Sequence, residues 1–225
     1  MNQAFVSWSG GKDCCQAAYK AAGERYELKY LLNMINPEVE RSFSHGISTR
    51  WIKMQSEALG IPIIQQHTDG KNYETQFIAA LKKMRAEGIT HGVFGDIDFQ
   101  PHREWIENVC RPAGIEYLLP LWQGDQKQIA LDFINQGFET VIIATQADKL
   151  GPEFLGRIFD KAFLSEIVAM GNISPCGEAG EYHTMVVNGP LFKQKIVIDE
   201  SVKIKRDNHW FLDIKSCRLT DKKNS

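Results

Sequence analysis

The chain has 225 residues and a formal net charge of −2, which excludes the strongly basic balance of a general nucleic-acid binder. Its composition, 43% hydrophobic and 24% charged, is that of a globular protein that buries a core without disulfides. The five cysteines are odd in number and form no CxxC pair, which argues against a disulfide framework or a cysteine-rich zinc site. Residues 1–8 lack a signal-peptide pattern and no run of about 18 apolar residues occurs, so we expect a soluble cytoplasmic protein.

Short apolar runs alternate with amphipathic stretches through the first half of the chain. Their periodicity predicts, in order, strand 4–8, helix 13–22, strand 30–35, helix 48–59, a strand from 63, helix 75–87, strand 91–96, helix 101–110 and strand 115–121. Gly88 stands where a left-handed helix cap is expected. This alternation predicts an α/β fold, with a mostly parallel sheet and helices on both faces. Ligands of such sheets bind beyond the carboxyl ends of the strands, where Ser9, Asn36 and Asp96 fall.

The pattern changes after about Trp122. It predicts helix 128–136, strand 140–145, helix 156–170, a loop over 171–180, and antiparallel strands at 182–187, 195–198 and 210–214. We therefore expect a nucleotide-binding domain over residues 1–122 and a smaller α+β domain over residues 123–225.

The sharpest local motif runs from Ser9 to Cys14, between the first strand and the first helix. Gly10 and Gly11 allow a tight turn whose amide groups converge on phosphate oxygens, and the helix N-terminus favours the same anion. Lys12 supplies a mobile cation for charge developing on pyrophosphate, and Asp13 either holds Mg²⁺ or caps the helix. The spacing fits neither the Walker loop nor GxGxxG, and the alternative is a structural turn.

A second dense cluster follows the predicted loop, reading GEAGEYHT over residues 177–184. Its two acids could grip an amine, orient Mg²⁺ or act as a general base, whereas the plainer interpretation is a solvated polar turn. The candidate substrate-binding residues of this loop are Gly177, Glu178, Gly180, Glu181, His183 and Thr184, with Glu178 and Glu181 also catalytic candidates.

Further candidates lie between these motifs. Gly95 and Asp96 end a predicted strand, and Glu104 lies at the start of the next helix, so both acids are candidates for the metal or the reaction centre. Met34 ends the second strand, where adenine could stack, and His45 is a loop histidine that could approach the nucleotide.

The residues Ser9-Gly10-Gly11-Lys12-Asp13 resemble the SGGKD(S) loop of the N-type ATP pyrophosphatases. Together with Gly95-Asp96-Ile97, the GEAGEYHT loop and Gly189-Pro190-Leu191-Phe192, they are similar to the diphthine–ammonia ligase family. The resemblance spans residues 5–192 and implies a HUP (Rossmann-like) nucleotide-binding domain followed by a smaller domain. This chain departs from the family pattern at Cys14, where Ser is usual, and at Ala179 and His183, which replace a glycine and an acid.

The resemblance implies an ATP-dependent carbon–nitrogen ligase. An acceptor carboxylate attacks ATP to give an acyl-adenylate and pyrophosphate, and ammonia then displaces AMP. ATP and Mg²⁺ are the implied cofactors, with Ser9, Gly10, Gly11, Lys12, Asp13 and Cys14 around the phosphates. The acceptor is either the diphthine side chain of elongation factor 2 or, through a bacterial sister group, a corrinoid carboxylate of cobalamin salvage. The same phosphate loop is compatible with a tRNA-modifying pyrophosphatase and with a non-catalytic nucleotide sensor, and homo-oligomerisation stays open.

Overall fold

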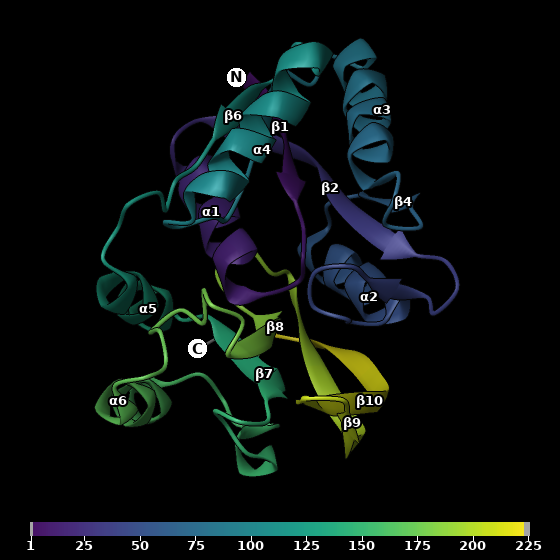
Figure 1. The fold of residues 1–225 in the computed structure, drawn as a ribbon. Helices are drawn as coiled ribbons and strands as arrows, with labels where there is room; N and C mark the ends of the chain where they lie inside the picture. Colours follow the sequence, from purple (N-terminus) through teal and green to yellow (C-terminus); the bar gives the residue numbers. More distant parts are fainter. Residues whose placement is uncertain (1, 223–225) are drawn as a thin grey trace. The chain divides into compact units, whose positions relative to one another are not determined.

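The structure is a computed structural model that describes residues 2–222 (Figure 1). The chain divides into two compact units. The first unit holds the chain up to Ser9 together with Asp13–Gln123, and the second holds Gly10–Lys12 together with the chain from Gly124 onward. Over residues 2–222, every helix is too short or too polar to cross a lipid bilayer.

The first unit contains a six-stranded sheet whose ladders are parallel except for that of β3. Its elements are β1 (Asn2–Ser7), α1 (Lys12–Gly23), β2 (Tyr26–Asn36), β3 (Arg41–Ser42), α2 (Thr49–Leu59), β4 (Ile63–His67), α3 (Tyr73–Ala86), β5 (His91–Val93), α4 (Gln100–Cys110), η1 (Arg111–Ala113) and β6 (Glu116–Leu118). The predicted strand–helix alternation and the mostly parallel sheet are thereby confirmed. Strands 91–96 and 115–121 are shorter than predicted, because pairing with β1 ends at Val93 and pairing with β5 ends at Leu118.

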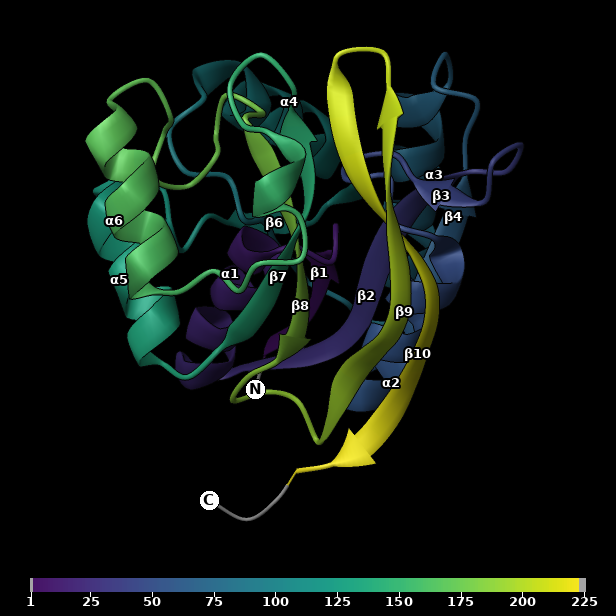
Figure 2. The same ribbon diagram turned by 90° about the horizontal axis from the view of Figure 1, so that it is seen from below.

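The helices cover both faces of this sheet, as predicted. Helices α3 and α4 share one core with the strands, in which Phe5 and Leu32 pack against Phe77 and Ile106. The connections through α1 and α2 run along the sheet in the direction opposite to those through α3 and α4. Because such crossovers are right-handed, α1 and α2 lie on the other face (Figures 1 and 2). Gly88 follows α3 with φ +95°, as the helix-cap prediction requires.

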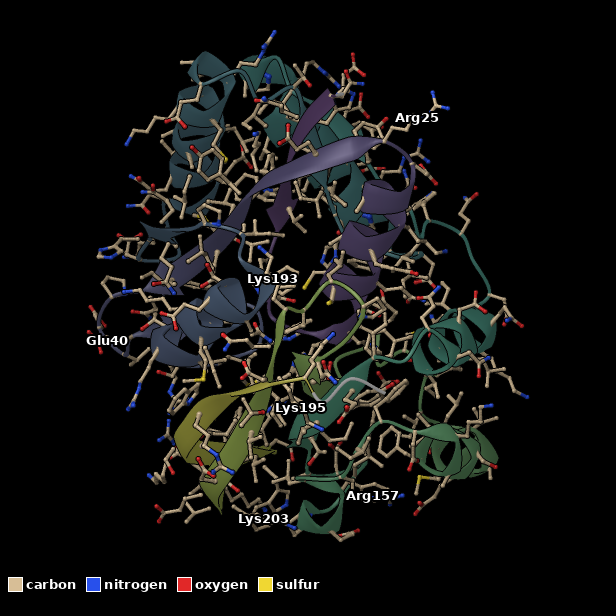
Figure 3. All side chains as sticks on the ribbon, turned by 180° about the vertical axis from the view of Figure 1, so that it is seen from behind. Arg25, Glu40, Arg157, Lys193, Lys195 and Lys203 are labelled. Carbon is tan, nitrogen blue, oxygen red and sulfur yellow. The ribbon has the colours of Figure 1, made fainter. Side chains whose placement is uncertain are left out.

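The parallel strands lie in the order β4-β2-β1-β5-β6, so the direction of succession reverses between β1 and β5. In doubly wound sheets, ligands bind beyond the carboxyl ends of the strands at this reversal. Ser9 follows β1 and Asp96 follows β5, so the topology brings these two sequence candidates to one edge. Arg25 and Glu40 mark the two ends of the long strand β2, whose turns both use positive φ angles (Figure 3).

The second unit contains a four-stranded antiparallel sheet in the order β8-β7-β10-β9. Its elements are α5 (Gln126–Asn135), β7 (Glu139–Gln146), η2 (Pro152–Phe154), α6 (Lys161–Met170), β8 (Tyr182–Asn188), β9 (Gln194–Arg206) and β10 (His209–Asp221). Helices α5 and α6 lie side by side (Figure 2), and the Phe163 ring of α6 meets Tyr182 of β8 edge to face at 5.4 Å. The predicted antiparallel strands are confirmed.

Two boundaries in this unit differ from the prediction. The helix begins at Lys161 rather than at Gly156, because residues 157–159 instead bond along the edge of β7. Asp160 then caps the helix through its side chain, which accepts a hydrogen bond from Phe163 N at 2.8 Å. Strands β9 and β10 are each 13 residues long, which is longer than predicted, and they form a hairpin. Lys195, near the start of β9, forms an ion pair with Glu139 of β7 (Figure 3).

Candidate functional site

The start of α1 lies at the carboxyl edge of the first unit's sheet. The Ser9 hydroxyl donates to the Cys14 sulfur at 3.4 Å, so the thiol that replaces the usual Ser accepts a bond from within the loop. Gly95 passes directly against this turn, since a Cβ there would lie 2.6 Å from Cys14 N and 2.7 Å from Asp13 C. Only glycine allows so close an approach, which explains why Gly95 precedes Asp96 at this point of the sheet.

The central residues of the phosphate loop, Gly10 to Lys12, belong to the second unit. Gly10 has φ +86°, as the tight turn predicted. Its carbonyl accepts from Val186 N at 3.0 Å, and Lys12 N donates to Thr184 Oγ1 at 3.0 Å. Strand β8 therefore holds both sides of the loop, and the two motifs singled out in the sequence meet through these bonds.

The Lys12 side chain is buried, which the sequence pattern did not predict. It is only 4% exposed, and its ammonium donates to the Cys176 carbonyl oxygen. The same nitrogen lies 5.5 Å from the centroid of the Tyr182 ring and 6.0 Å from that of Phe159. Aromatic faces and a carbonyl together stabilise a cation removed from water, so the structure gives Lys12 a fixed resting position.

Glu181 is the most strongly anchored residue of the GEAGEYHT loop. It is 2% exposed, and its carboxylate accepts from Ser174 N at 2.8 Å, Ser174 Oγ at 3.0 Å and Ala179 N at 3.0 Å. Burial raises the pKa of this carboxyl, but the hydrogen bonds from Ser174 and the charge of Lys149 outweigh that effect and leave the pKa lowered. Glu181 is thus an ionised residue that stabilises the loop, and its contact with substrate stays a prediction.

Glu178 and the two loop glycines take their positions from the same network. Glu178 N donates to Ser174 Oγ at 2.8 Å, and Gly177 N donates to Ser174 O at 3.0 Å. Gly177 and Gly180 have φ +71° and +78°, and a Cβ on Gly177 would lie 2.9 Å from Tyr182 O. Hydrogen bonds to Ser174 and two glycines in left-handed conformations therefore define the turn that contains Glu178.

His183 and Thr184 are neighbours on β8, and their side chains alternate between the faces of the strand. The Thr184 hydroxyl is committed to Lys12 N. Burial, the charge of Lys12 and that of His209 lower the pKa of His183 to about 4. The imidazole is therefore neutral at physiological pH.

The two acids of the first unit are placed differently. Asp96 Oδ1 lies 2.9 Å from His102 Nδ1, and its side chain is 25% exposed at the edge beyond β5. Glu104 is exposed on α4 and accepts from Gln100 Nε2 at 3.1 Å. The structure brings Asp96, through Gly95, to the start of α1, while the hydrogen bond of Glu104 stays within its own helix.

Met34 and His45 flank the short strand β3. The Met34 side chain is 4% exposed and packed in the core, while its carbonyl accepts from Phe43 N at 3.0 Å. His45 lies in the turn that leads to Gly46, whose amide donates to Ser42 O at 3.0 Å. The side chain of Met34 is thus packed in the core and its carbonyl is bonded to Phe43, and contacts of both residues with adenine stay predictions.

Sequence reasoning missed Ser174 and Tyr182 as organisers of the loop. Ser174 bonds to Glu181, Glu178 and Gly177, so it joins the turn at three points. The Tyr182 hydroxyl donates to Pro175 O at 2.6 Å while its ring faces the Lys12 ammonium. The signal for Ser174 is its place before Pro-Cys-Gly, since serine hydroxyls commonly bond to main chain at the start of turns.

A doubly wound α/β unit whose first strand leads toward a glycine loop, and an antiparallel unit whose strand β8 holds that loop near an acidic turn, define a nucleotide-using class of protein. The family model described as the diphthamide synthase N-terminal domain matches residues 2–117, and the diphthamide synthase C-terminal domain matches residues 125–220. The chain therefore belongs to the diphthamide synthase family.

Curated relatives agree with this assignment. The chain is 27% identical to the diphthine–ammonia ligase of Rattus norvegicus over 239 residues, covering 94% of this chain and 88% of the relative. It is 26% identical to the human diphthine–ammonia ligase over 86% of this chain and 81% of the relative. A solved structure described as a predicted subunit of tRNA methyltransferase from Methanocaldococcus jannaschii aligns over 84% of this chain and 98% of its own, with 19% identity and a TM-score of 0.47.

Proposed function

We propose that this chain is an ATP-dependent ligase that converts an acceptor carboxylate to an amide with ammonia and releases AMP and pyrophosphate. The observation that carries the proposal is the direct joining of the two motifs, Thr184 Oγ1 to Lys12 N, in a chain that both diphthamide synthase models match. The relatives' name, diphthine–ammonia ligase, supports the diphthine side chain of elongation factor 2 as the acceptor.

A carboxylate is a poor electrophile, so it must first be activated. Attack of its oxygen on the α-phosphorus of ATP expels pyrophosphate and leaves an acyl-adenylate. Ammonia then adds to the acyl carbon and expels AMP, a far better leaving group than oxide. Gly10, Gly11 and the N-terminus of α1 would hold the negative charge of the phosphates. Glu178, in the GEAGEYHT loop, would bind ammonia or the acceptor.

Magnesium fits this site as a companion of ATP rather than as a resident metal. Residues 2–222 contain no group of three or more His, Cys, Asp or Glu side chains suited to hold a metal ion. Mg²⁺ needs no such cage, because it commonly takes one or two carboxylates together with substrate phosphates and water. Asp13, in the first turn of α1, would supply that carboxylate, and the ion would neutralise phosphate charge.

Product analysis by mass spectrometry tests the proposal. The purified chain is incubated with Mg-ATP and ammonium chloride, with no acceptor, with diphthine-bearing elongation factor 2, or with corrinoid acids. AMP and pyrophosphate formed only with elongation factor 2, together with replacement of OH by NH₂ on its diphthine, is the expected result. The same products with a corrinoid acid would reassign the acceptor. ADP, or intact ATP in every arm, would contradict adenylation and favour a nucleotide sensor.

A matched pair of variants ties the reaction to the site. Asp13→Asn keeps the size of the side chain but removes the charge for Mg²⁺, so we expect AMP formation to fall by at least about a hundredfold. Glu166→Gln serves as the control, because this half-exposed acid of α6 only pairs with Arg157 at the surface. Equal activity of the two variants would refute the role of Asp13.

A further inference from the structure

Asn33 is a buried polar residue on strand β2. Its neighbours along the strand, Leu32 and Met34, belong to the core that the strands share with α3 and α4. Because side chains alternate along a strand, Asn33 lies on the opposite face of the sheet, where it is 2% exposed. A side-chain amide at such depth is costly unless hydrogen bonds replace its lost hydration, so its partners are informative.

The amide nitrogen of Asn33 bonds to two separate segments. Asn33 Nδ2 donates to Trp8 O at 2.7 Å and to Ser42 Oγ at 3.0 Å. The main-chain carbonyl of Trp8 can only accept, so the amide cannot turn over without setting two oxygens against each other. A single side chain, in one fixed orientation, therefore joins the residue that follows β1 to the short strand β3.

Trp8 is the residue that precedes the phosphate loop. Strand β1 ends one residue earlier, although Trp8 N still donates to Leu32 O at 2.7 Å. The Asn33 amide holds the carbonyl of Trp8, and its indole Nε1 donates to Gln55 Oε1 of α2 at 2.9 Å. The loop therefore begins, at Ser9, directly after a buried residue that is fixed at three points.

Ser42, the second partner of Asn33, holds a turn. Its amide donates to Ile47 O at 2.8 Å, which closes the turn over residues 42–47, called the β3 turn here. The Ser42 side chain is buried and accepts from the Asn33 amide. His45, the histidine expected to approach the nucleotide, lies in this turn. The two bonds of Asn33 thus connect the β3 turn to the start of the phosphate loop.

We propose that Asn33 is a positioning residue that holds the β3 turn and the start of the phosphate loop at the spacing that one nucleotide requires. This inference rests on the proposed function and on the expectation that Ser9 and the N-terminus of α1 meet the phosphates while the β3 turn meets the adenosine end. Asn33 acts through the two segments that it joins, without contact with the nucleotide.

The consequence is cooperative binding of the two ends of ATP. A ligand that links two groups gains affinity over the separate groups only when the protein presents both subsites at the matching distance. Loss of the Asn33 bonds should therefore weaken binding of the whole nucleotide more than binding of either half. A purely structural role would lower stability and leave the ratio of these affinities unchanged.

Calorimetric titration of the purified chain with three probes measures this cooperativity. The probes are adenosine, pyrophosphate with Mg²⁺, and α,β-methylene-ATP, in which the bond that releases pyrophosphate cannot be cleaved. Ser42→Ala removes the acceptor of one Asn33 bond and leaves the bond to Trp8 in place. We expect it to weaken binding of α,β-methylene-ATP about tenfold and binding of each half by less than about twofold. Asn33→Leu removes both bonds at similar side-chain volume and should weaken binding of the analogue further.

Ser56→Ala is the matched control. Ser56 is also a buried serine of the first unit, but its hydroxyl donates to Ile61 O at 2.6 Å and joins only the end of α2 to the chain that follows. This variant should lose stability comparably to Ser42→Ala in denaturation and leave all three affinities unchanged. Equal affinity of the two alanine variants for the analogue would overturn the inference, and so would an equal loss for the analogue and for one half alone.

Ligase kinetics separate this inference from the proposed function. Ser42→Ala should raise KM for ATP and leave kcat and KM for the acceptor within about twofold of the unchanged chain. An active ligase with an unchanged KM for ATP would overturn the inference alone. Cooperative binding that is lost in Ser42→Ala, in a chain that yields AMP with none of the acceptors, would support the inference while contradicting the proposed function. Failure of the unchanged chain to bind α,β-methylene-ATP would overturn both.

Discussion

The hydrogen bond from Lys12 N to Thr184 Oγ1 predicts that Thr184→Val destabilises the protein. Valine has nearly the same shape as threonine, so the change removes the acceptor while leaving the packing of this buried position intact. The amide of Lys12 lies in the first turn of α1, where the helix itself offers no acceptor. A buried donor left without its partner costs about 1–3 kcal/mol, so we expect a loss of unfolding free energy in that range.

Thr140 on the neighbouring strand β7 provides the matched control. It is fully buried, and within residues 2–222 its hydroxyl has no hydrogen-bond partner. Thr140→Val therefore replaces an unsatisfied hydroxyl with a methyl group, and we expect stability to stay unchanged or to rise. The same chemical substitution should thus destabilise the protein at Thr184 and should not do so at Thr140.

Equilibrium denaturation in guanidinium chloride and thermal unfolding measure the difference. For a protein of this size, 1 kcal/mol corresponds to about 2–4 °C in Tm. Hydrogen exchange supplies a local check, because the Lys12 amide should lose protection in Thr184→Val and keep it in Thr184→Ser. A difference of less than about 0.5 kcal/mol between the two valine variants would refute the argument that Thr184 holds the phosphate loop.

Three further predictions concern His183, Gly95 and two buried cysteines. Because the pKa of His183 is lowered to about 4, the unfolded chain takes up a proton first as the pH falls. Stability should therefore decline between about pH 6.5 and 4, and His183→Asn should flatten that decline in denaturation curves. Gly95→Ala forces backbone apart at the start of α1, so we expect a loss of about 1–3 kcal/mol and a raised KM for ATP; an unchanged KM would contradict the close packing. Burial raises the pKa of the Cys15 and Cys110 thiols, the latter to about 12, so mass spectrometry should find both unlabelled by iodoacetamide in the native protein.

The first unit is largely predictable because its signals are local. Each strand is a short apolar run and each helix has an apolar stripe, so periodicity locates the elements from β1 to β6. The sequence pattern places Ser9 and Asp96 at the carboxyl ends of strands, where ligands of such sheets bind. Only the structure shows that β1 and β5 are neighbours, so that the ends of these two strands lie together.

Predictions fail where contacts between distant residues override local pattern. Residues 157–159 precede α6 and could extend it, but they form hydrogen bonds with the part of β7 that β10 does not cover. A helix over these residues would lose those bonds. The prediction made strands β9 and β10 too short, because lysines and acids interrupt the alternation of apolar and polar residues where the hairpin is exposed. The burial of Lys12 could not be predicted, because a lysine beside two glycines is usually solvated. Its burial depends on Phe159, Cys176 and Tyr182, which no local window contains.

The GEAGEYHT loop shows why a motif does not reveal the role of each member. Glu181 and Thr184 have the residue types of a substrate site, yet both are buried and bonded to main chain, one within the loop and the other to Lys12. The residues that hold a loop must stay the same if the acceptor changes, whereas those that meet the acceptor need not. His183 lies on the other face of β8 from Thr184, and its imidazole is neutral at physiological pH because its pKa is lowered to about 4. A neutral side chain at this position offers an acceptor a hydrogen-bonding group without charge, so contact between His183 and an acceptor stays a prediction that the fixed positions of Glu181 and Thr184 do not decide.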